Sequence, residues 1–444
     1  MAKSASKTKP ALQSVHIDDK YDLDKDHIFI TGTQAVVRLT LMQKERDRRA
    51  GLNTGGYVTG YRGSPIGGLD LAMWKERARL TASDIHFEPG LNEDIAATAI
   101  WGAQQAEMRG EGKFDGVFGV WYAKGPGVDR SGDVFRHANM AGTSPNGGVL
   151  ALMGDDHVAE SSTTAHQSEF GLINYGMPVL SPAGVQEILD YGVIGYGLSR
   201  YASVWVGIKC VKDTIESTAV IDGRVDRIKL VEPKEDRRPK EGLSIRPNDT
   251  MLPQEARLVD HKLDAVLDYI VANKINKTIL SGGKKPKVGV IAAGKSYLDV
   301  RQAMDDLGID EVRGNNLGLR LFKAGCVWPL PKKELVAFGK GLDLILVVEE
   351  KRALMESQVR EALYGTSNPP VIVGKKGEKD QWLLSQKAQL DSNTIAIALG
   401  ERVNRFAKDK KLAEHVQRLK KAQAQLNAVE GVAMRVPYFC AGCP

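Results

Sequence analysis

The chain has 444 residues, of which 42% are hydrophobic and 26% are charged, and its formal net charge is +6. This length predicts about three domains, and the hydrophobic content together with 46 glycines is typical of a soluble α/β protein. The modest net charge does not predict nucleic-acid binding, although a basic face that attracts an acidic electron carrier stays open. No run of about 18 apolar residues occurs, so the sequence predicts no membrane-spanning helix and no membrane partner.

The cysteines and the N-terminus indicate the compartment. Only Cys210, Cys326, Cys440 and Cys443 occur, which is too few for a disulfide scaffold, so a reducing cytoplasm is the expected location. Residues 1–25 begin with scattered lysines but have no apolar core like that of a signal peptide. We expect a disordered tail there.

Short apolar runs alternate with helical patterns through the first half of the chain. Such alternation is typical of a parallel sheet that is covered on both faces. A helix is expected from Gly32, with Thr33 as its N-cap, and another from Asn92 to Arg109, built on small residues. The expected strands are 28–31, 57–60, 117–121, 149–153 and 204–210.

The sequence changes character after Val231. A charged, proline-bearing segment at 232–241 predicts a linker, and an amphipathic pattern at 258–275 predicts a helix. Strands at 288–294, 342–348 and 370–373 predict a second α/β unit, and a charged helix is expected at 407–428. The expected divisions are a tail at 1–25, an α/β domain at 26–231, a linker and helix at 232–279, a second α/β domain at 280–405, and a helix with the start of a further domain at 406–444.

One segment formally matches a nucleotide-binding motif. Residues 289–296 read Gly-Val-Ile-Ala-Ala-Gly-Lys-Ser, which is the P-loop pattern, and Glu349 and Glu350 after an apolar strand look like its acidic partner. A P-loop needs a loop whose N–H groups point at phosphate, whereas these middle residues continue an apolar strand. We therefore predict that Gly289 lies inside a strand and that no phosphate site exists at Gly294.

The last residues include a Cys-x-x-Cys pair, Cys440-Ala-Gly-Cys443. This spacing presents two thiolates to one metal ion or cluster. An iron–sulfur cluster needs about four such ligands, so the pair is an incomplete set and the chain reads as a fragment or as a subunit whose partner carries the rest. Two free thiols in a frayed tail remain the alternative.

Two earlier segments match a family of thiamine enzymes in order and spacing. The strand ending at Gly60 leads into Tyr61-Arg-Gly-Ser-Pro65, and Asn92-Glu93 opens a helix of small residues. Together with Cys440-Ala-Gly-Cys443, these segments resemble the 2-oxoacid:ferredoxin oxidoreductases, and in particular the indolepyruvate:ferredoxin oxidoreductase branch in its long fused bacterial form. Taken alone, a carboxylate in the first turn of a helix complements the helix dipole.

The second α/β unit carries a resemblance of its own. Residues 290–296, 327–331 and 344–350 are similar to the transketolase C-terminal-like domain of thiamine enzymes. The resemblance as a whole covers about residues 26–444. It implies two doubly wound, mainly parallel-sheet domains, of which the first is the pyrimidine-binding domain for thiamine diphosphate and the second is the transketolase C-terminal-like domain.

The family implies roles for individual residues. Glu93 would be the catalytic carboxylate that binds N1′ of the aminopyrimidine ring and exchanges a proton with it. Arg62 and Ser64 would bind the substrate, since a guanidinium can clamp a carboxylate, although a surface arginine on a turn is the alternative for Arg62. The cofactor-binding residues that the resemblance implies are Tyr61, Pro65, Asn92, Gly125 and Gly127.

A third segment, Gly154-Asp-Asp-His157, follows an expected strand. The residues alone allow a divalent metal site there, because Glu160, His166 and Glu169 follow closely. The resemblance implies instead a loop near the active site, with Ser161, Ser162 and Gln167 at the family's serine and glutamine positions.

The implied reaction is the oxidative decarboxylation of an aryl or branched 2-oxoacid to its acyl-CoA, with electrons passed to ferredoxin. The cofactors would be thiamine diphosphate, Mg²⁺ and a [4Fe–4S] cluster on Cys440 and Cys443. Since no Gly-Asp-Gly motif follows Cys443, Mg²⁺ and the diphosphate would be held mainly by a domain outside this chain, in a homodimer or in association with a chain that carries that domain. The chain alone would then be inactive.

Two other functions stay open on the sequence. One is a P-loop ATP-binding protein such as an acyl-CoA synthetase, which the conformation of Gly289 discriminates. The other is a non-catalytic scaffold derived from the enzyme, which the sequence does not separate because Glu93 is retained.

Overall fold

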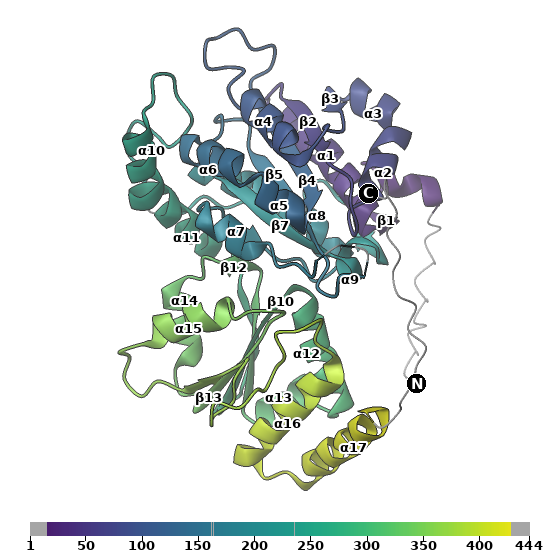
Figure 1. The fold of residues 1–444 in the computed structure, drawn as a ribbon, viewed down its shortest axis with the longest axis vertical. Helices are drawn as coiled ribbons and strands as arrows, with labels where there is room; N and C mark the ends of the chain where they lie inside the picture. Colours follow the sequence, from purple (N-terminus) through teal and green to yellow (C-terminus); the bar gives the residue numbers. More distant parts are fainter. Residues whose placement is uncertain (1–15, 161, 163, 235, 428–444) are drawn as a thin grey trace, which may run out of the picture.

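The computed structural model describes residues 16–427 apart from residues 161, 163 and 235. The described chain forms two α/β units, drawn one above the other in Figure 1. None of the helices in this part combines enough length with enough hydropathy to cross a membrane. The expected tail at 1–25 is wrong for its second part, where Ile17–Tyr21 form a 3₁₀ helix and Tyr21 is buried.

The first unit contains a seven-stranded sheet in the order β12-β6-β7-β5-β4-β2-β3. Every neighbouring pair is parallel except β12 with β6, so the prediction of a mainly parallel sheet is confirmed. The strand β12 comes from the second half of the chain and covers the sheet edge. The strands are β2 (Gly55–Gly60), β3 (Ile85–Phe87), β4 (Val117–Lys124), β5 (Val149–Asp155), β6 (Val179–Leu180), β7 (Trp205–Val211) and β12 (Cys326–Trp328).

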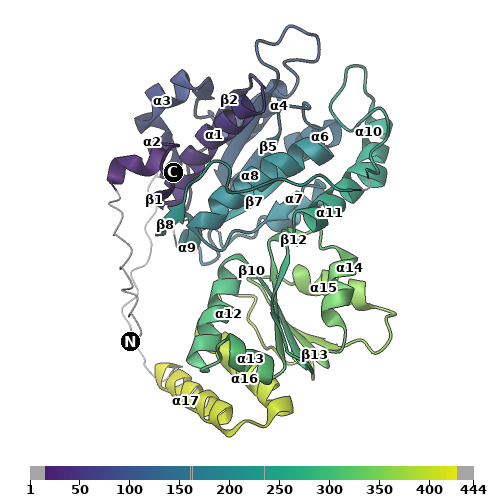
Figure 2. The same cartoon turned by 180° about the vertical axis from the view of Figure 1, so that it is seen from behind.

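Helices cover both faces of this sheet. Leu150 and Leu152 of β5 belong to the core beneath α1 and α8, whereas Ala151 and Met153 belong to the core beneath α4 and α6, as the two-residue period of a strand requires. Figure 1 is seen from the side of α4 to α7, and Figure 2 from the side of α1 and α8. The helices are α1 (Gly32–Arg49), α2 (Leu69–Lys75), α3 (Arg77–Ala82), α4 (Glu93–Ala103), α5 (Gly125–Arg130), α6 (Gly132–Ala141), α7 (Glu169–Asn174), α8 (Val185–Ala202) and α9 (Lys212–Ile215).

The second unit contains a five-stranded sheet in the order β14-β13-β10-β11-β9, in which only β9 is antiparallel to its neighbour. Its core on the side of α14 and α15 is continuous with the core beneath α4 and α6. The strands are β9 (Lys277–Ser281), β10 (Val288–Ala293), β11 (Leu319–Ala324), β13 (Leu344–Val348) and β14 (Val371–Val373). The helices are α12 (Gly294–Asp306), α13 (Glu311–Asn316), α14 (Lys332–Gly339), α15 (Met355–Leu363), α16 (Ser392–Ala407) and α17 (Lys410–Asn427).

The strand predicted at 28–31 is confirmed as β1 (His27–Thr31), which lies outside the parallel sheet and pairs antiparallel with β8 (Thr218–Asp222). Two local predictions are wrong. The N-cap of α1 is Thr31, because Thr31 and Gln34 form a capping box at 3.0 Å each. The helix α4 ends at Ala103 instead of Arg109, since Gln104 turns inward and donates to the Val117 carbonyl oxygen.

A buried lysine holds the connection between the two units. The expected helix at 258–275 begins earlier, as α10 (Met251–Arg257), continues through a π-helical turn at Leu258–Lys262 and ends as α11 (Leu263–Ala272). Lys262 is fully buried, and its Nζ donates to the carbonyl oxygens of Asn139 and Met140 at the C-terminus of α6, each at 3.1 Å. Burial lowers the pKa of Lys262 to about 7.

This contact predicts a pH-dependent stability. Lys262→Met keeps the length of the side chain but leaves two helix-end carbonyls without their partner, which costs about 1–3 kcal/mol of the free energy of unfolding. The folded pKa lies below the usual value of 10.5, so the unfolded chain binds more protons between these values. The stability of the wild type relative to the variant is therefore expected to rise from pH 7 to pH 9. Urea midpoints of both proteins at the two pH values measure this, and an equal difference at both would contradict it.

Candidate functional site

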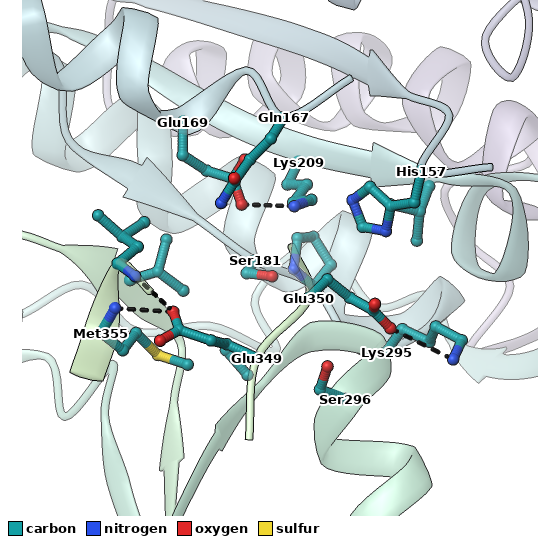
Figure 3. A pocket seen from close by; sticks show the side chains of 15 residues that line it. His157, Gln167, Glu169, Ser181, Lys209, Lys295, Ser296, Glu349, Glu350 and Met355 are labelled. Carbon is teal, nitrogen blue, oxygen red and sulfur yellow. Dashed lines mark hydrogen bonds and ion pairs between the residues drawn. The ribbon is translucent and has the colours of Figure 1, made fainter. Parts of the chain in front are cut away.

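The carboxyl-terminal edges of the two sheets face each other. A cavity of about 40 Å³ lies between them, room for two or three water molecules. Val211 at the end of β7 and Ala293 at the end of β10 both line it, together with Glu349, which follows β13. Figure 3 shows charged side chains from both units pointing into this space. The edge at the carboxyl ends of parallel strands is where α/β proteins place their ligand sites.

The charged groups around this cavity are buried and paired. Lys209 on β7 forms an ion pair with Glu169, and its Nζ lies 3.7 Å from Asp155 Oδ2. The neighbouring carboxylates raise the pKa of Lys209 against the effect of its burial. Glu349 accepts hydrogen bonds from the backbone N–H groups of residues 354–356 at 2.7–3.0 Å, yet burial raises its pKa to about 7.

The P-loop hypothesis is contradicted by the same region. Gly289 lies inside β10 with a parallel partner on each side, as predicted from its apolar neighbours. Lys295 Nζ donates to Asp299 at 2.7 Å and to the Leu390 carbonyl oxygen at 2.9 Å. A Cβ atom built on Gly294 would collide with the Ser181 side chain, so the first unit fills the space that a phosphate would need.

The residues that the sequence singled out lie at the ends of three neighbouring strands. The strand β2 is followed by Tyr61, Arg62, Ser64 and Pro65, and the strand β3 is followed by the start of α4. Gly125 and Gly127 follow β4, which pairs with β2. Tyr61 and Arg62 are exposed. These residues therefore share one edge of the sheet.

Ser64 and Pro65 face a second cavity, of about 30 Å³. Asp155, His157 and Gln389 also line it, so this loop meets the segment after β5 and a residue of the second unit. Burial lowers the pKa of His157 to about 2, and its Nε2 is buried without a hydrogen-bond partner.

Glu93 is buried at the first position of α4, with 8% of its surface exposed. Asn92 caps the helix by accepting from Ile95 N–H at 2.9 Å, and Trp121 Nε1 donates to the Glu93 backbone oxygen at 2.9 Å. The Glu93 carboxylate, in contrast, forms an ion pair with Arg130, whose Nε lies 4.0 Å from Oε2, and it accepts no hydrogen bond from the described residues. Its hydrogen-bonding capacity is therefore available to a ligand.

Gly127 packs directly against the Glu93 side chain and forms what we call its glycine wall. A Cβ atom on Gly127 would lie 2.5 Å from Glu93 Cγ, so any larger residue would push into the space of the glutamate. Gly125, two residues earlier, leaves room for the His166 ring in the same way. The two glycines are therefore explained by close packing on Glu93 and His166.

The metal hypothesis for the segment after β5 is not supported. Among the residues that the structure describes, no group of three or more His, Cys, Asp or Glu side chains is placed to hold a metal ion. Asp155 instead accepts from the backbone N–H of Ser168 at 2.9 Å and from its hydroxyl, and Gln167 accepts from Arg352 N–H at 3.1 Å. Cys440 and Cys443 lie outside the described residues.

Comparison with known proteins shows which proteins the chain resembles. Residues 278–426 match the family model described as the indolepyruvate oxidoreductase domain. The chain is 24% identical to the indolepyruvate oxidoreductase subunit IorA of Methanothermobacter marburgensis, over 82% of this chain and 53% of that protein. It is 24% identical to IorA of Pyrococcus abyssi over 96% of this chain and 59% of that protein.

Residues 278–426 thus match the indolepyruvate oxidoreductase domain, and most of the chain is similar to IorA. The chain spans somewhat more than half the length of the curated relatives that it matches. A solved 2-oxoglutarate:ferredoxin oxidoreductase from Magnetococcus marinus has a similar fold, with a TM-score of 0.60 and 18% identity over 85% of this chain and 66% of that one. This likeness agrees with the predicted fold of mainly parallel α/β units.

Lys209 is a site residue that sequence reasoning missed, and Glu169 was named there only as a candidate metal ligand. Lys209 stands in an otherwise apolar strand, Val-Gly-Ile-Lys-Cys. A lysine in a buried strand needs a buried carboxylate, and Glu169 on α7 is that partner. The lysine alone could have indicated a buried ion pair. The sequence does not identify its partner, because Glu169 is 40 residues away along the chain.

The blocked P-loop predicts that the chain does not bind ATP. Calorimetric titration with ATP and Mg²⁺ is expected to show no micromolar binding, because Lys295 is already bonded and Gly294 faces a side chain. Lys295→Ala serves as the control. Micromolar binding by the wild type that the variant loses would contradict the structure of this turn.

Proposed function

We propose that this chain supplies the aminopyrimidine side of a thiamine diphosphate site in an indolepyruvate-type 2-oxoacid:ferredoxin oxidoreductase, with Glu93 as the catalytic carboxylate. The observation that carries the proposal is the Glu93 side chain: it is buried at the start of α4, it lacks a hydrogen bond, and it lies against a glycine wall. A glutamate that only complements the helix dipole in the first helical turn is typically exposed to solvent.

The residues around Glu93 fit an aminopyrimidine ring. The ring needs one carboxylate at N1′ and otherwise apolar or small neighbours, and Gly127 and Ala123 near the Glu93 side chain are of that kind. When bound, thiamine diphosphate supplies the nucleophilic carbon and the electron sink that 2-oxoacid decarboxylation needs. Glu93 would hold a proton at N1′, and the burial of the carboxylate would keep water from competing for it.

The substrate side of the site is proposed on the loop after β2. Ser64 lines the cavity beside Asp155 and His157, where its hydroxyl can donate to a carbonyl or carboxylate oxygen. Arg62 is exposed beside Asp70 and would clamp the 2-oxoacid carboxylate. Tyr61 and Pro65 would shape the loop that carries them.

The remaining parts of the enzyme are assigned by proposal. Residues 26–231 would be the pyrimidine-binding domain and residues 280–405 the transketolase C-terminal-like domain. Mg²⁺ and the diphosphate would be held mainly by a domain outside this chain. Cys440 and Cys443 would contribute to a [4Fe–4S] cluster, and coenzyme A and ferredoxin would be the further reactants. The chain would meet the diphosphate-binding domain in a homodimer or a hetero-assembly.

A non-catalytic scaffold is the second candidate. A largely buried carboxylate that accepts no hydrogen bond is a cost that a scaffold has no reason to keep, so the state of Glu93 favours the enzyme. The ATP-binding alternative is not proposed, because β10 runs through its motif.

Glu93→Gln tests the proposal. Glutamine keeps the size and a hydrogen bond but does not exchange the proton, so turnover of a 2-oxoacid by the complete enzyme is expected to fall by roughly a hundredfold or more, while the fold is kept. Glu88→Gln is the matched control, since the Glu88 side chain is 68% exposed at the end of β3. Stopped-flow or steady-state reduction of ferredoxin with indolepyruvate or a related 2-oxoacid gives the rates.

Two results would overturn the assignment of Glu93. One is near-normal 2-oxoacid oxidation by the Glu93→Gln enzyme. The other is an equal loss of activity in Glu88→Gln, which would show that the region responds to any change of charge.

A further inference from the structure

One short helix separates the Glu93 side chain from a buried ion-pair network. The helix α5 covers only Gly125–Arg130 and follows β4 directly. On one side, Gly127 packs against Glu93, and Arg130 Nε donates to Asp94 Oδ1 at 3.0 Å. The position of α5 therefore decides how much room the Glu93 carboxylate has.

His166 holds the other side of this helix. Its ring packs against Gly125, where a Cβ atom would collide with the imidazole, and its Nε2 lies 2.9 Å from Asp129 Oδ2. The His166 side chain is 14% exposed and that of Asp129 is 67% exposed. The contact between His166 and Asp129 thus links a mostly buried imidazole to the solvent-exposed side of α5.

His166 is in turn anchored to the end of β5. Its Nδ1 lies 3.2 Å from Ser168 Oγ and 3.6 Å from Oδ1 of Asp155, which is fully buried. The Ser168 N–H and hydroxyl both donate to Asp155. The carboxylates of Asp155 and Asp129 raise the pKa of His166 to about 9 against the effect of its burial.

We propose that His166 is a positioning residue for Glu93: it clamps α5 between the buried Asp155 and the first turn of α4, and so keeps the Glu93 carboxylate against its glycine wall. The inference rests on the proposed function of Glu93. It adds a role for a residue that touches neither the Glu93 carboxylate nor the loop at 61–65.

A native tryptophan reports on this clamp without any assay of activity. Trp121 is fully buried, and its indole N–H donates to the Glu93 backbone oxygen. Trp205 is buried in the same core, but its indole N–H has no partner. The ¹⁵N-indole spectrum of the 444-residue chain therefore distinguishes a local shift of Glu93 from a general loosening of the core.

The experiment compares His166→Ala with Asp129→Asn and with the control His86→Ala, whose side chain is 64% exposed. Asp129→Asn weakens the clamp from its exposed side and leaves the buried Asp155 untouched, so the fold is kept. Both clamp variants are expected to move the Trp121 indole signal and to speed its hydrogen exchange by about tenfold relative to Trp205. An unchanged Trp121 signal in both variants, or equal changes at Trp121 and Trp205, would overturn the proposal.

Activity separates this inference from the function it rests on. In the complete enzyme His166→Ala is expected to lower kcat by about tenfold, since small misplacements of a catalytic group are costly, and to leave KM within about twofold. In a Glu93→Gln background the same change is expected to add no further loss, because His166 acts through Glu93. Independent losses that multiply would overturn the positioning role. Normal activity of Glu93→Gln with a shifted Trp121 signal would instead refute the proposed function and leave the clamp standing.

Discussion

The structure depends on bringing the carboxyl-terminal edges of two parallel sheets together without leaving charges unpaired. Ionised side chains taken out of water cost several kcal/mol each unless they find partners. At this junction the partners come from both units: Lys351 Nζ donates to the His157 carbonyl oxygen, and Gln389 donates to Asp213. A continuous apolar core runs beneath the polar edge. The position of one unit relative to the other is thus fixed both by the packing of the apolar core and by the polar contacts at the sheet edges.

Against this background, the Glu93 carboxylate differs from the best-bonded carboxylates of the chain. Asp155 and Glu349 accept two or more hydrogen bonds each, whereas the Glu93 carboxylate pairs with Arg130 at 4.0 Å. The Glu107 carboxylate and one oxygen of Glu169 also lack hydrogen bonds, but Glu93 stands at a helix start and packs against Gly127. Unsatisfied groups that the surrounding structure holds in place are typical of sites that bind a ligand. The similarity to indolepyruvate oxidoreductase subunits gives that ligand a proposed identity.

The sequence predicted what depends on local pattern and failed where distant pairing decides. The apolar runs at 117–121 and 149–153 became central strands, and the apolar residues after Gly289 correctly excluded a P-loop. In contrast, β1 looked like a sheet strand, because nothing local shows that its partner β8 lies about 190 residues away. The cap at Thr31 was missed in favour of Thr33, although the capping box with Gln34 was readable. For the site, the order of Tyr61–Pro65 and Glu93 was enough to propose it, but the burial of Glu93 and the support from His166 arise only in three dimensions.

The most direct test of the account is a crystal structure of the complete enzyme with thiamine diphosphate bound. The account predicts that the aminopyrimidine ring lies at the start of α4, with the Glu93 carboxylate hydrogen-bonded to its N1′ and with Gly127 beside it. A ring bound elsewhere, or a Glu93 carboxylate that turns to solvent or pairs fully with Arg130 while the cofactor is bound, would contradict it.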